Sequence, residues 1–427
     1  MESHLPRRRA PLFTLVLTAF ACGSSEPPAE PSPSAGTSGA SGGAAGTSAA
    51  GGSAGAPGAA TAGAGGSSTE APPAPGGSGG NAGGNAGGGG AEPPSQADGG
   101  PTPADAEAAP VADAAPMPPG APLTNPAPGQ YGTRARLLEP NSEMAVAGLD
   151  GKVYVLGGYP SSRETQRTLQ IYDVATDTWK RGMPSPLPLH HPVLIGVDGL
   201  LYSLGGQPDT NLTLVYDPQT DTWAEKARMP TARGAGAAAN IGDKIYVVGG
   251  RPPAGNAFEV YDISDNAWTE LPDLPQAQAN RNHLAVAALR GKIYVAGGRY
   301  NGGNVGSPLS DSLDIFDPTT NQWAKGKSLL RPRGGLAAVV AFGCFHTYGG
   351  EGSNIGEPNG VFPDHDVYDP RTDTWTSLPK LPTPFHGVTG GAFVDGIIFM
   401  PGGGIRSGGN SGQTIHQVYR PAMRCDE

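Results

Sequence analysis

The N-terminal part of the sequence lacks an apolar run of membrane-spanning length. Its hydrophobic segment, APLFTLVLTAFA at residues 10–21, has 12 residues, whereas a transmembrane helix needs about 20. A permanent transmembrane anchor is therefore the less favoured interpretation. The segment follows Arg7, Arg8 and Arg9 and ends just before Cys22, which is the layout of a secretory signal peptide covering residues 1–21.

The residues around Cys22 resemble the lipobox of bacterial lipoproteins, in which a small residue precedes a cysteine. The match covers Ala19, Phe20, Ala21 and Cys22, and the Leu usual at the first of these positions is Ala19 here. The resemblance implies that Cys22 is lipidated and becomes the mature N-terminus. We then expect an exported protein, held in the bacterial cell envelope (outer membrane or periplasm) by its lipid only. The alternative is ordinary cleavage and release to the extracellular space.

Residues 22–130 lack Lys, Arg and aromatic residues, and consist almost entirely of Gly, Ala, Ser, Pro and Thr. Such a segment cannot bury enough apolar surface to offset the entropy of ordering, so we expect a disordered, flexible linker. Its eight charged residues are all acidic and account for most of the net charge of −10. The rest of the chain is nearly balanced in charge, which gives no electrostatic case for nucleic acid as a partner.

Beyond the N-terminal hydrophobic segment, aromatic residues and alternating patterns appear only from residue 131 onward, and there they recur. A short apolar strand runs into a double glycine six times, as GKVYVLGG (151–158), GLLYSLGG (199–206), DKIYVVGG (243–250), GKIYVAGG (291–298), GCFHTYGG (343–350) and GIIFMPGG (396–403). Downstream stretches such as LTLVYDPQTDTW and HDVYDPRTDTW end in a tryptophan five times, and the sixth copy stops at HQVYRP. The glycine pairs are 44 to 53 residues apart.

A repeat of this length, with a strand, a double glycine and a tryptophan in this order, resembles the Kelch repeat. Each copy of that repeat forms one four-stranded blade of a β-propeller. The resemblance implies an all-β fold: a six-bladed Kelch-type β-propeller at residues 131–427. The glycine pairs let neighbouring backbones approach closely, and the tryptophans supply buried surface between blades. We therefore assign to the scaffold Gly157, Gly158, Gly205, Gly206, Gly249, Gly250, Gly297, Gly298, Gly349, Gly350, Gly402, Gly403, Trp179, Trp223, Trp268, Trp323 and Trp375.

The truncated sixth copy would leave a blade with an unpaired outer edge, which favours aggregation. Residues 131–140 lie where an outer strand belongs in the repeat order. We therefore predict that they supply the fourth strand of the blade formed by residues 386–420, in a register that the sequence does not define.

Cysteine is scarce, with three residues in the whole chain. If Cys22 carries lipid, Cys344 and Cys425 remain as a pair in an oxidising compartment. The expected blade geometry places both at turns on the same face. A disulfide between them and a buried Cys344 with a free Cys425 stay open as alternatives.

The fold does not define the function, because propellers include enzymes, lectins and protein-binding modules. The Kelch resemblance implies that ligands meet the loops after the double glycines and the connections between blades. The loops hold Tyr159, Arg163, Arg251, Arg299, Tyr300, Glu351 and Arg406, and the connections hold His190, His191, Arg233, Arg281, His283, Arg331, Arg333 and His386. These side chains could bind an anionic ligand such as an acidic sugar or peptide. The alternative is that they fasten neighbouring loops of the scaffold.

Signals for catalysis are few. The sequence shows no Ser-His-Asp order, zinc-ligand spacing or phosphate-binding glycine loop, and its eight histidines suggest no copper site of the galactose-oxidase kind. A sialic-acid mutarotase of the Kelch type is the better enzymatic alternative, with Glu351, Arg299 and His386 as the first candidates. We expect no cofactor, no metal and no catalytic residue. The favoured interpretation is a monomeric binding module for an unidentified protein or glycan.

Overall fold

The computed structural model describes residues 124–426 except residues 163, 276–279, 303 and 410. The predicted signal peptide, Cys22, most of the predicted linker and Arg163 lie outside these residues. Among them, one short 3-10 turn, η1 (Pro358–Gly360), is the only helical element, and all other regular elements are strands. No helix in this part of the chain is long and apolar enough to cross a bilayer.

Four antiparallel four-stranded sheets follow the repeats in chain order. The first contains β6 (Val193–Val197), β7 (Leu200–Leu204), β8 (Thr213–Asp217) and β9 (Thr222–Glu225). The second contains β10 (Ala237–Ile241), β11 (Lys244–Val248), β12 (Phe258–Asp262) and β13 (Ala267–Leu271). The third contains β14 (Ala285–Leu289), β15 (Lys292–Ala296), β16 (Leu313–Asp317) and β17 (Gln322–Gly326). The fourth contains β18 (Ala337–Ala341), β19 (Cys344–Tyr348), β20 (His365–Asp369) and β21 (Thr374–Ser377).

The remaining strands form one eight-stranded sheet, in the order β1-β24-β23-β22-β2-β3-β4-β5. One half consists of β2 (Met144–Leu149), β3 (Lys152–Leu156), β4 (Leu169–Asp173) and β5 (Thr178–Gly182). The other half consists of β22 (Val388–Val394), β23 (Ile397–Pro401), β24 (His416–Arg420) and β1 (Gln130–Arg134). The two antiparallel halves meet through a short parallel pairing of β2 with β22.

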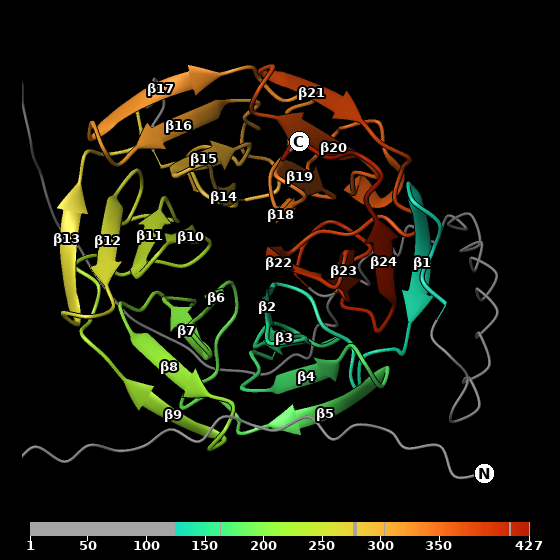
Figure 1. Cartoon of the computed structure of the whole chain (residues 1–427), viewed down its shortest axis with the longest axis horizontal. Coiled ribbons are helices and arrows are strands. Elements are labelled where there is room, and N and C mark those ends of the chain that lie inside the picture. The colour runs from blue at the N-terminus through green and yellow to red at the C-terminus, as the bar shows by residue number, and fades with distance from the viewer. Residues whose placement is uncertain (1–123, 163, 276–279, 303, 410, 427) are drawn as a thin grey trace, which may run out of the picture. The chain divides into compact units, whose positions relative to one another are not determined.

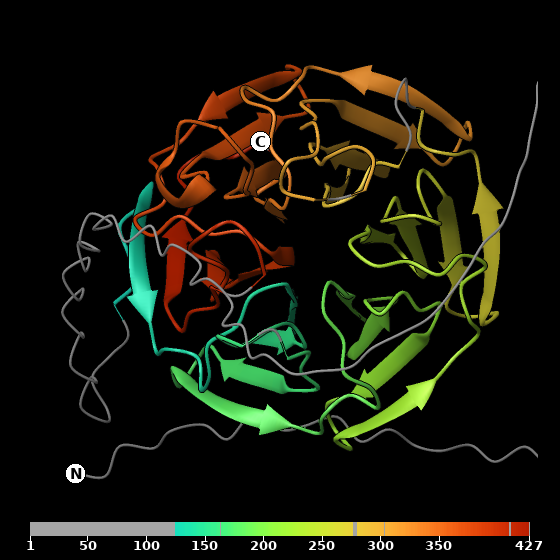
Figure 2. The same ribbon diagram turned by 180° about the vertical axis from the view of Figure 1, so that it is seen from behind.

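The sheets stand around a central axis like the blades of a propeller (Figure 1). The first strand of each repeat lies nearest the axis, and the fourth lies at the rim, in both the front view and the view from behind (Figure 2). Burial follows this order: β3, β7, β11 and β15 are buried from their second residue onward, whereas the rim strands β5, β13 and β17 alternate between exposed and partly buried residues. The apolar inner strands are buried because neighbouring sheets cover both of their faces.

The N-terminal segment closes the ring, as predicted. β1 pairs antiparallel with β24, from Gln130 opposite Arg420 to Arg134 opposite His416. The strand uses only the first part of the predicted stretch and begins one residue before it. Residues before Gln130 also pack on it, since the Arg134 guanidinium donates to Asn125 Oδ1 at 2.6 Å. The ordered domain therefore begins before residue 131.

Each tryptophan forms a hydrogen bond that links its blade to the preceding one. The indole Nε1 donates to a backbone carbonyl of the preceding inter-blade connection, at 2.8 Å from Trp223 to Met183 and from Trp375 to Lys327. In four of the five repeats an aspartate or asparagine two residues before the tryptophan adds a second link. Asp373 Oδ1 accepts hydrogen bonds from the Tyr368 hydroxyl and from the Lys327 backbone N–H, each at 2.8 Å. These contacts place the tryptophans in the scaffold.

The first glycine of each pair lies against the next repeat. A Cβ on Gly157 would collide with the carbonyl oxygen of Leu189, and its φ of +66° is in the left-handed region. The amide N–H of the second glycine, Gly158, donates to that same carbonyl at 2.7 Å. A side chain at the first position is therefore excluded by both space and conformation.

The two faces of the propeller differ. One, called the loop face below, carries the connections between the second and third strands and those between successive blades. The opposite turn face carries the tight turns, and Cys344 and Cys425 form a disulfide there, with their Cα atoms 5.1 Å apart. The Cys425 amide also donates to the Phe342 carbonyl at 2.8 Å, so the C-terminal tail is attached to the β18–β21 sheet.

Candidate functional site

A ring of six residues surrounds the axis on the loop-face side, one at the start of each inner strand. We call it the axial belt: Glu143, His191, Ala235, His283, Gly335 and Gly387. Backbone hydrogen bonds of 2.7 to 3.3 Å run from each member to the one before it, and the Met144 amide closes the ring onto the Gly387 carbonyl. All six have a φ between +51° and +70°. For Glu and His this conformation is uncommon and is held in place by the belt.

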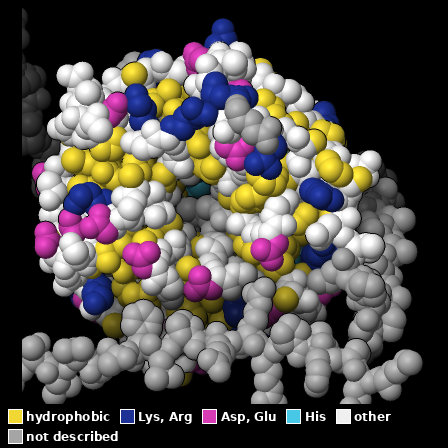
Figure 3. Space-filling model, viewed as in Figure 1, with side chains coloured by type: hydrophobic (Ala, Val, Ile, Leu, Met, Phe, Trp, Pro, Cys, Tyr) yellow, Lys and Arg dark blue, Asp and Glu magenta, His cyan; other side chains and the backbone are white. Residues whose placement is uncertain are grey.

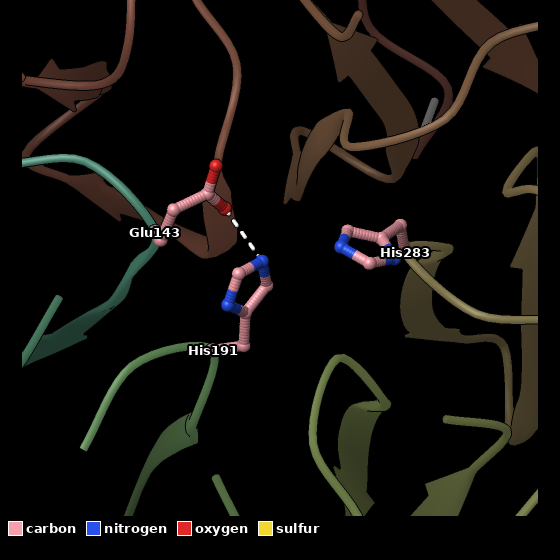
Figure 4. Close-up of side chains that lie close together, drawn as sticks. All are labelled: Glu143, His191 and His283. Atoms are coloured by element: carbon pink, nitrogen blue, oxygen red, sulfur yellow. Dashed lines mark ion pairs between the residues drawn. The ribbon is translucent and has the colours of Figure 1, made fainter. Parts of the chain in front are cut away.

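The belt directs three functional side chains toward the axis (Figure 4). His191 Nε2 lies 2.7 Å from Glu143 Oε2, and the His283 ring lies edge-on to the His191 ring, with centroids 4.9 Å apart. The other three belt positions are Ala235, Gly335 and Gly387, whose small side chains leave the centre open. These residues line a cavity of about 10 Å³, enough for about one water molecule.

A second group of side chains surrounds Glu143. His386 Nδ1 lies 3.4 Å from both Glu143 Oε1 and Glu351 Oε1, while its Nε2 lies 2.7 Å from the Arg406 carbonyl. Glu351 also accepts a hydrogen bond from Arg299 at 2.6 Å and one from the Gly408 amide at 2.7 Å. Three of the predicted ligand-binding residues, Arg299, Glu351 and His386, therefore meet at the centre, where Glu351 contacts the other two.

The electrostatics of this centre favour a charged Glu143 and neutral rings at His283 and His190. Burial alone would raise the pKa of Glu143, but the imidazoles of His191, His386 and His283 lower that pKa below its usual value. Burial, with Arg299 and His191 as further causes, lowers the pKa of His283 well below its usual value. Burial and His191 likewise lower the pKa of His190 to about 3.

Two sets of side chains have the geometry to hold a metal ion: Glu143 with His191 and His283, and Glu143 with Glu351 and His386. In each set the candidate ligand atoms lie within 4.8 Å of one another. Sequence reasoning found no metal-ligand set, because these residues come from different repeats and have no local spacing. Glu143 was missed altogether. Aligning the repeats on the segment one or two residues before each inner strand would have placed Glu143, His191 and His283 at equivalent positions.

Three of the predicted ligand-binding arginines lie inside the blades. Arg233, Arg281 and Arg333 are at most 1% exposed. Their guanidinium groups pair with Glu259, Asp314 and Asp366 of their own sheets at 2.5 to 2.6 Å. They also donate to backbone carbonyls, for example from Arg281 Nε to Gly297 at 2.7 Å. The geometry thus supports the scaffold alternative for these three and offers no route to a ligand.

Among the other predicted residues that the structure describes, His190 contacts the axial belt, and the rest have contacts within their own loops or between neighbouring ones. His190 Nδ1 lies 2.6 Å from His191 Nδ1, and the His190 ring contacts that of Tyr159. The Tyr300 hydroxyl lies 3.0 Å from the Ser310 hydroxyl, and Arg251 lies 3.4 Å from Gln207 Oε1. Arg406 is exposed. Figure 3 shows this centre as a hollow in the middle of the molecule, with histidine visible inside it.

Comparisons with known proteins agree with the repeat pattern. A family model described as KLHDC2/KLHL20/DRC7 Kelch-repeats domain matches residues 190–403, and one described as Kelch motif matches residues 140–186. The chain is 32% identical over 328 residues to Kelch-like protein terF of Aspergillus terreus, which covers 70% of this chain and 69% of that protein.

Two further matches are more distant. The chain is 28% identical over 237 residues to Beta-scruin of Limulus polyphemus, covering 52% of this chain but only 26% of Beta-scruin. The solved structure titled Structure of YjhT superposes with a TM-score of 0.53 at 18% identity, covering 66% of this chain and 95% of that one. At this identity the likeness shows the fold alone. From its repeats, its ring of sheets and these matches, the chain belongs to the family of Kelch-repeat β-propeller proteins.

Proposed function

We propose that this chain is an exported, lipid-anchored binding protein that recognises a protein partner through the loop face of its propeller. One observation carries the proposal. Among the described residues, the large apolar side chains that are exposed are Leu138, Met183, Leu330 and Ile405, from 40% to 56%. All four lie in loop-face connections. Single exposed apolar residues are ordinary, but their restriction to one face indicates a surface suited to contact another protein.

The size of the central cavity supports a protein partner over a small molecule. Small-molecule pockets usually have volumes of several hundred Å³, whereas the cavity at the axis has about 10 Å³. Loops on a rigid scaffold are also the usual place for recognition. The described loops after β15 and β19 supply much of this face, and partner contact there needs no rearrangement of the buried blades.

Glycan binding or sugar isomerisation by a mutarotase-like site is the second candidate. The convergence of Arg299, Glu351 and His386 favours it, because a carboxylate, an imidazole and a guanidinium could bind an acidic sugar and move a proton. A bound sugar would have to displace the Glu351 carboxylate from Arg299, which it contacts at 2.6 Å. It would also have to open the narrow centre, so we rank this candidate below protein binding.

We infer that the ring has six blades, with the eight-stranded sheet counting as two. The parallel β2–β22 pairing joins two halves that each have four antiparallel strands. The axial belt supports this count, since its members come from six successive repeats. We also propose that the domain acts as a monomer at the end of a flexible linker, because the ring closes on its own strands.

Capture from the cell envelope with the full-length chain tests the main proposal. The double variant Leu330→Asp, Ile405→Asp places charges on the loop face, and Gln219→Asp is the matched control on the turn face. We expect cross-linking to recover a defined partner with the wild type and the control, but not with the double variant. Equal recovery by all three would refute loop-face recognition. A glycan array with the same proteins then tests the second candidate function, glycan binding, which requires specific binding of acidic sugars.

A further inference from the structure

The centre of the axial belt combines two imidazoles and one carboxylate around a cavity of single-atom size. From this geometry we propose that Glu143, His191 and His283 bind one divalent transition-metal ion of the Zn²⁺ type on the propeller axis. Two histidines with one glutamate are a known ligand set for zinc, and imidazole nitrogen suits such borderline ions. This site is independent of the proposed partner-binding surface.

The protonation pattern of His283 suits a metal ligand. The Asn282 amide nitrogen donates to the carbonyls of Asn280 and Asn301, at 2.8 and 3.1 Å, which fixes its oxygen as the acceptor facing His283. His283 Nδ1 lies 2.6 Å from that oxygen and must therefore donate to it. In the neutral ring, Nε2 then keeps its lone pair. Figure 4 shows this edge of the ring turned toward Glu143 and His191.

His191 has a similar supporting contact. Its Nδ1 lies 2.6 Å from Nδ1 of His190, so one of these two nitrogens donates a hydrogen bond to the other. The His190 lone pair can accept a proton carried on His191 Nδ1, which leaves His191 Nε2 available to a metal. Hydrogen bonds of this kind, from the second ring nitrogen of a ligating histidine, are usual around protein metal sites.

The spacing needs only small side-chain adjustments. The candidate ligand atoms lie within 4.8 Å of one another, and tetrahedral zinc with bonds of 2.0 to 2.1 Å needs them about 3.3 Å apart. Glu143 Oε2 and His191 Nε2, now 2.7 Å apart, share a proton. The ion would take the place of that proton, which leaves to solvent, and the two atoms would move slightly apart.

The surroundings leave space for the ion, and a carboxylate neutralises one of the two nearby arginines. The belt residues Ala235, Gly335 and Gly387 present no bulky side chain to the cavity. Arg251 and Arg299 are close enough to influence His283 and oppose a cation. Glu351 neutralises Arg299 through their 2.6 Å contact. With three protein ligands, the fourth position on the ion is left to a water molecule.

Equilibrium dialysis of the full chain, without a polyhistidine tag, against Zn²⁺ tests the site. We expect one tightly held Zn²⁺ per wild-type chain and one proton released, measured by calorimetry in two buffers of different ionisation enthalpy. Glu143→Gln and His283→Gln should each weaken Zn²⁺ binding at least tenfold, whereas Glu225→Gln on the exposed rim should not. Failure of the wild type to retain Zn²⁺ at micromolar concentration, or unchanged affinity in folded His283→Gln, overturns the proposal.

A measurement on the wild type alone guards against misfolded variants. Anomalous scattering at the zinc edge from a Zn²⁺-soaked crystal should give a peak between Glu143, His191 and His283. A peak only at another position, or none, refutes the site regardless of how the variants behave.

Discussion

At the residue scale, the contact between neighbouring blades depends on one carboxylate or amide oxygen that accepts two hydrogen bonds. Asp373 links the Tyr368 hydroxyl of its own blade to a backbone N–H of the preceding connection. Asn266 does the same for Tyr261 and the Ala227 amide, at 2.7 and 2.9 Å. Both residues have a positive φ, which Asn and Asp tolerate better than most. The turn therefore needs a short side chain with an acceptor oxygen.

Asp373→Ala should destabilise the domain by about 2 kcal/mol, because two hydrogen bonds and tolerance of the left-handed conformation are lost together. Asp373→Asn keeps the acceptor oxygen and should remain within about 0.5 kcal/mol of the wild type. Urea denaturation of the two variants checks this. Similar losses for Ala and Asn would show that the carboxylate charge matters more than the acceptor geometry.

Buried histidines should make the fold sensitive to acid. Burial lowers the pKa of His190, His346 and His416 from 6.5 to about 3. The native state thus binds fewer protons than the unfolded state between these values, and stability falls as the pH drops below about 6.5. Each group contributes a slope of up to about 1.4 kcal/mol per pH unit.

Urea denaturation midpoints measured from pH 7 to pH 4 give this slope. His416→Gln removes one titrating group and should reduce the slope by the contribution of that one group. A wild-type stability that stays level over this range would contradict the burial argument for these side chains.

The sequence predicted part of the site. Arg299, Glu351 and His386 were selected from loop positions, and they do meet at the centre. Arg233, Arg281 and Arg333 have the same side-chain chemistry and similar repeat positions, but they pair with acids in their own sheets. Those acids, such as Asp314 in β16, lie 26 to 33 residues away, in strands whose sequences predict burial. Local pattern could not reveal that a charge was paired within the blade.

At the element scale, ring closure depends on β1. It pairs with the outer edge of β24 over five residue pairs. Its residue Tyr131 also contacts the neighbouring blade, where the tyrosine hydroxyl lies 2.7 Å from His365 Nδ1. An uncovered β24 would expose unpaired backbone groups, which promote edge-to-edge association. β1 thus connects the two ends of the domain and also contacts a third segment.

A domain that begins at residue 136 should therefore be far less stable than one that begins at residue 124. We expect the shorter chain to lose cooperative unfolding and to form higher oligomers, as measured by thermal denaturation and size-exclusion chromatography. Two chains with the same melting temperature and elution volume would show that β1 is dispensable.

Most of this architecture was accessible from the sequence, because each repeat carries its own strand, glycine and tryptophan signals. The closing strand was placed by the count of strands in the last repeat, although YGTR resembles no other rim strand. Its register was not predictable, since it depends on contacts with β24 and His365. The parallel contact between β2 and β22 was also beyond local pattern, because it arises where the first and last repeats meet.

At the scale of the whole molecule, β1 begins and β24 ends on the turn face. Gln130 pairs with Arg420, and the tail beyond Arg420 reaches the disulfide of Cys425 with Cys344. The loop face is on the other side. Residues 124–126 turn back along β1, since Thr124 accepts a hydrogen bond from Arg134 and Pro126 lies beside Gly132.

The proposed lipid anchor predicts whether the chain enters the detergent phase or the aqueous phase. Expressed in a bacterium, the wild-type chain should enter the detergent phase and give an N-terminal peptide carrying acyl chains on Cys22, because such chains favour a lipid environment. Cys22→Ser should move to the aqueous phase, while Cys425→Ser should partition as the wild type does. An unmodified Cys22 in the mature wild-type protein would rule out lipidation.

The pairing of β1 with β24 also determines how the domain would bear mechanical load. Once residues 124–129 have been drawn away from β1, tension between Gln130 and a partner on the loop face would act along the axis of β1. The β1–β24 ladder is then loaded in shear, so its five residue pairs share the force at once instead of opening one after another. The propeller would resist being pulled away from its point of attachment, and the first element to yield under rising force would be β1.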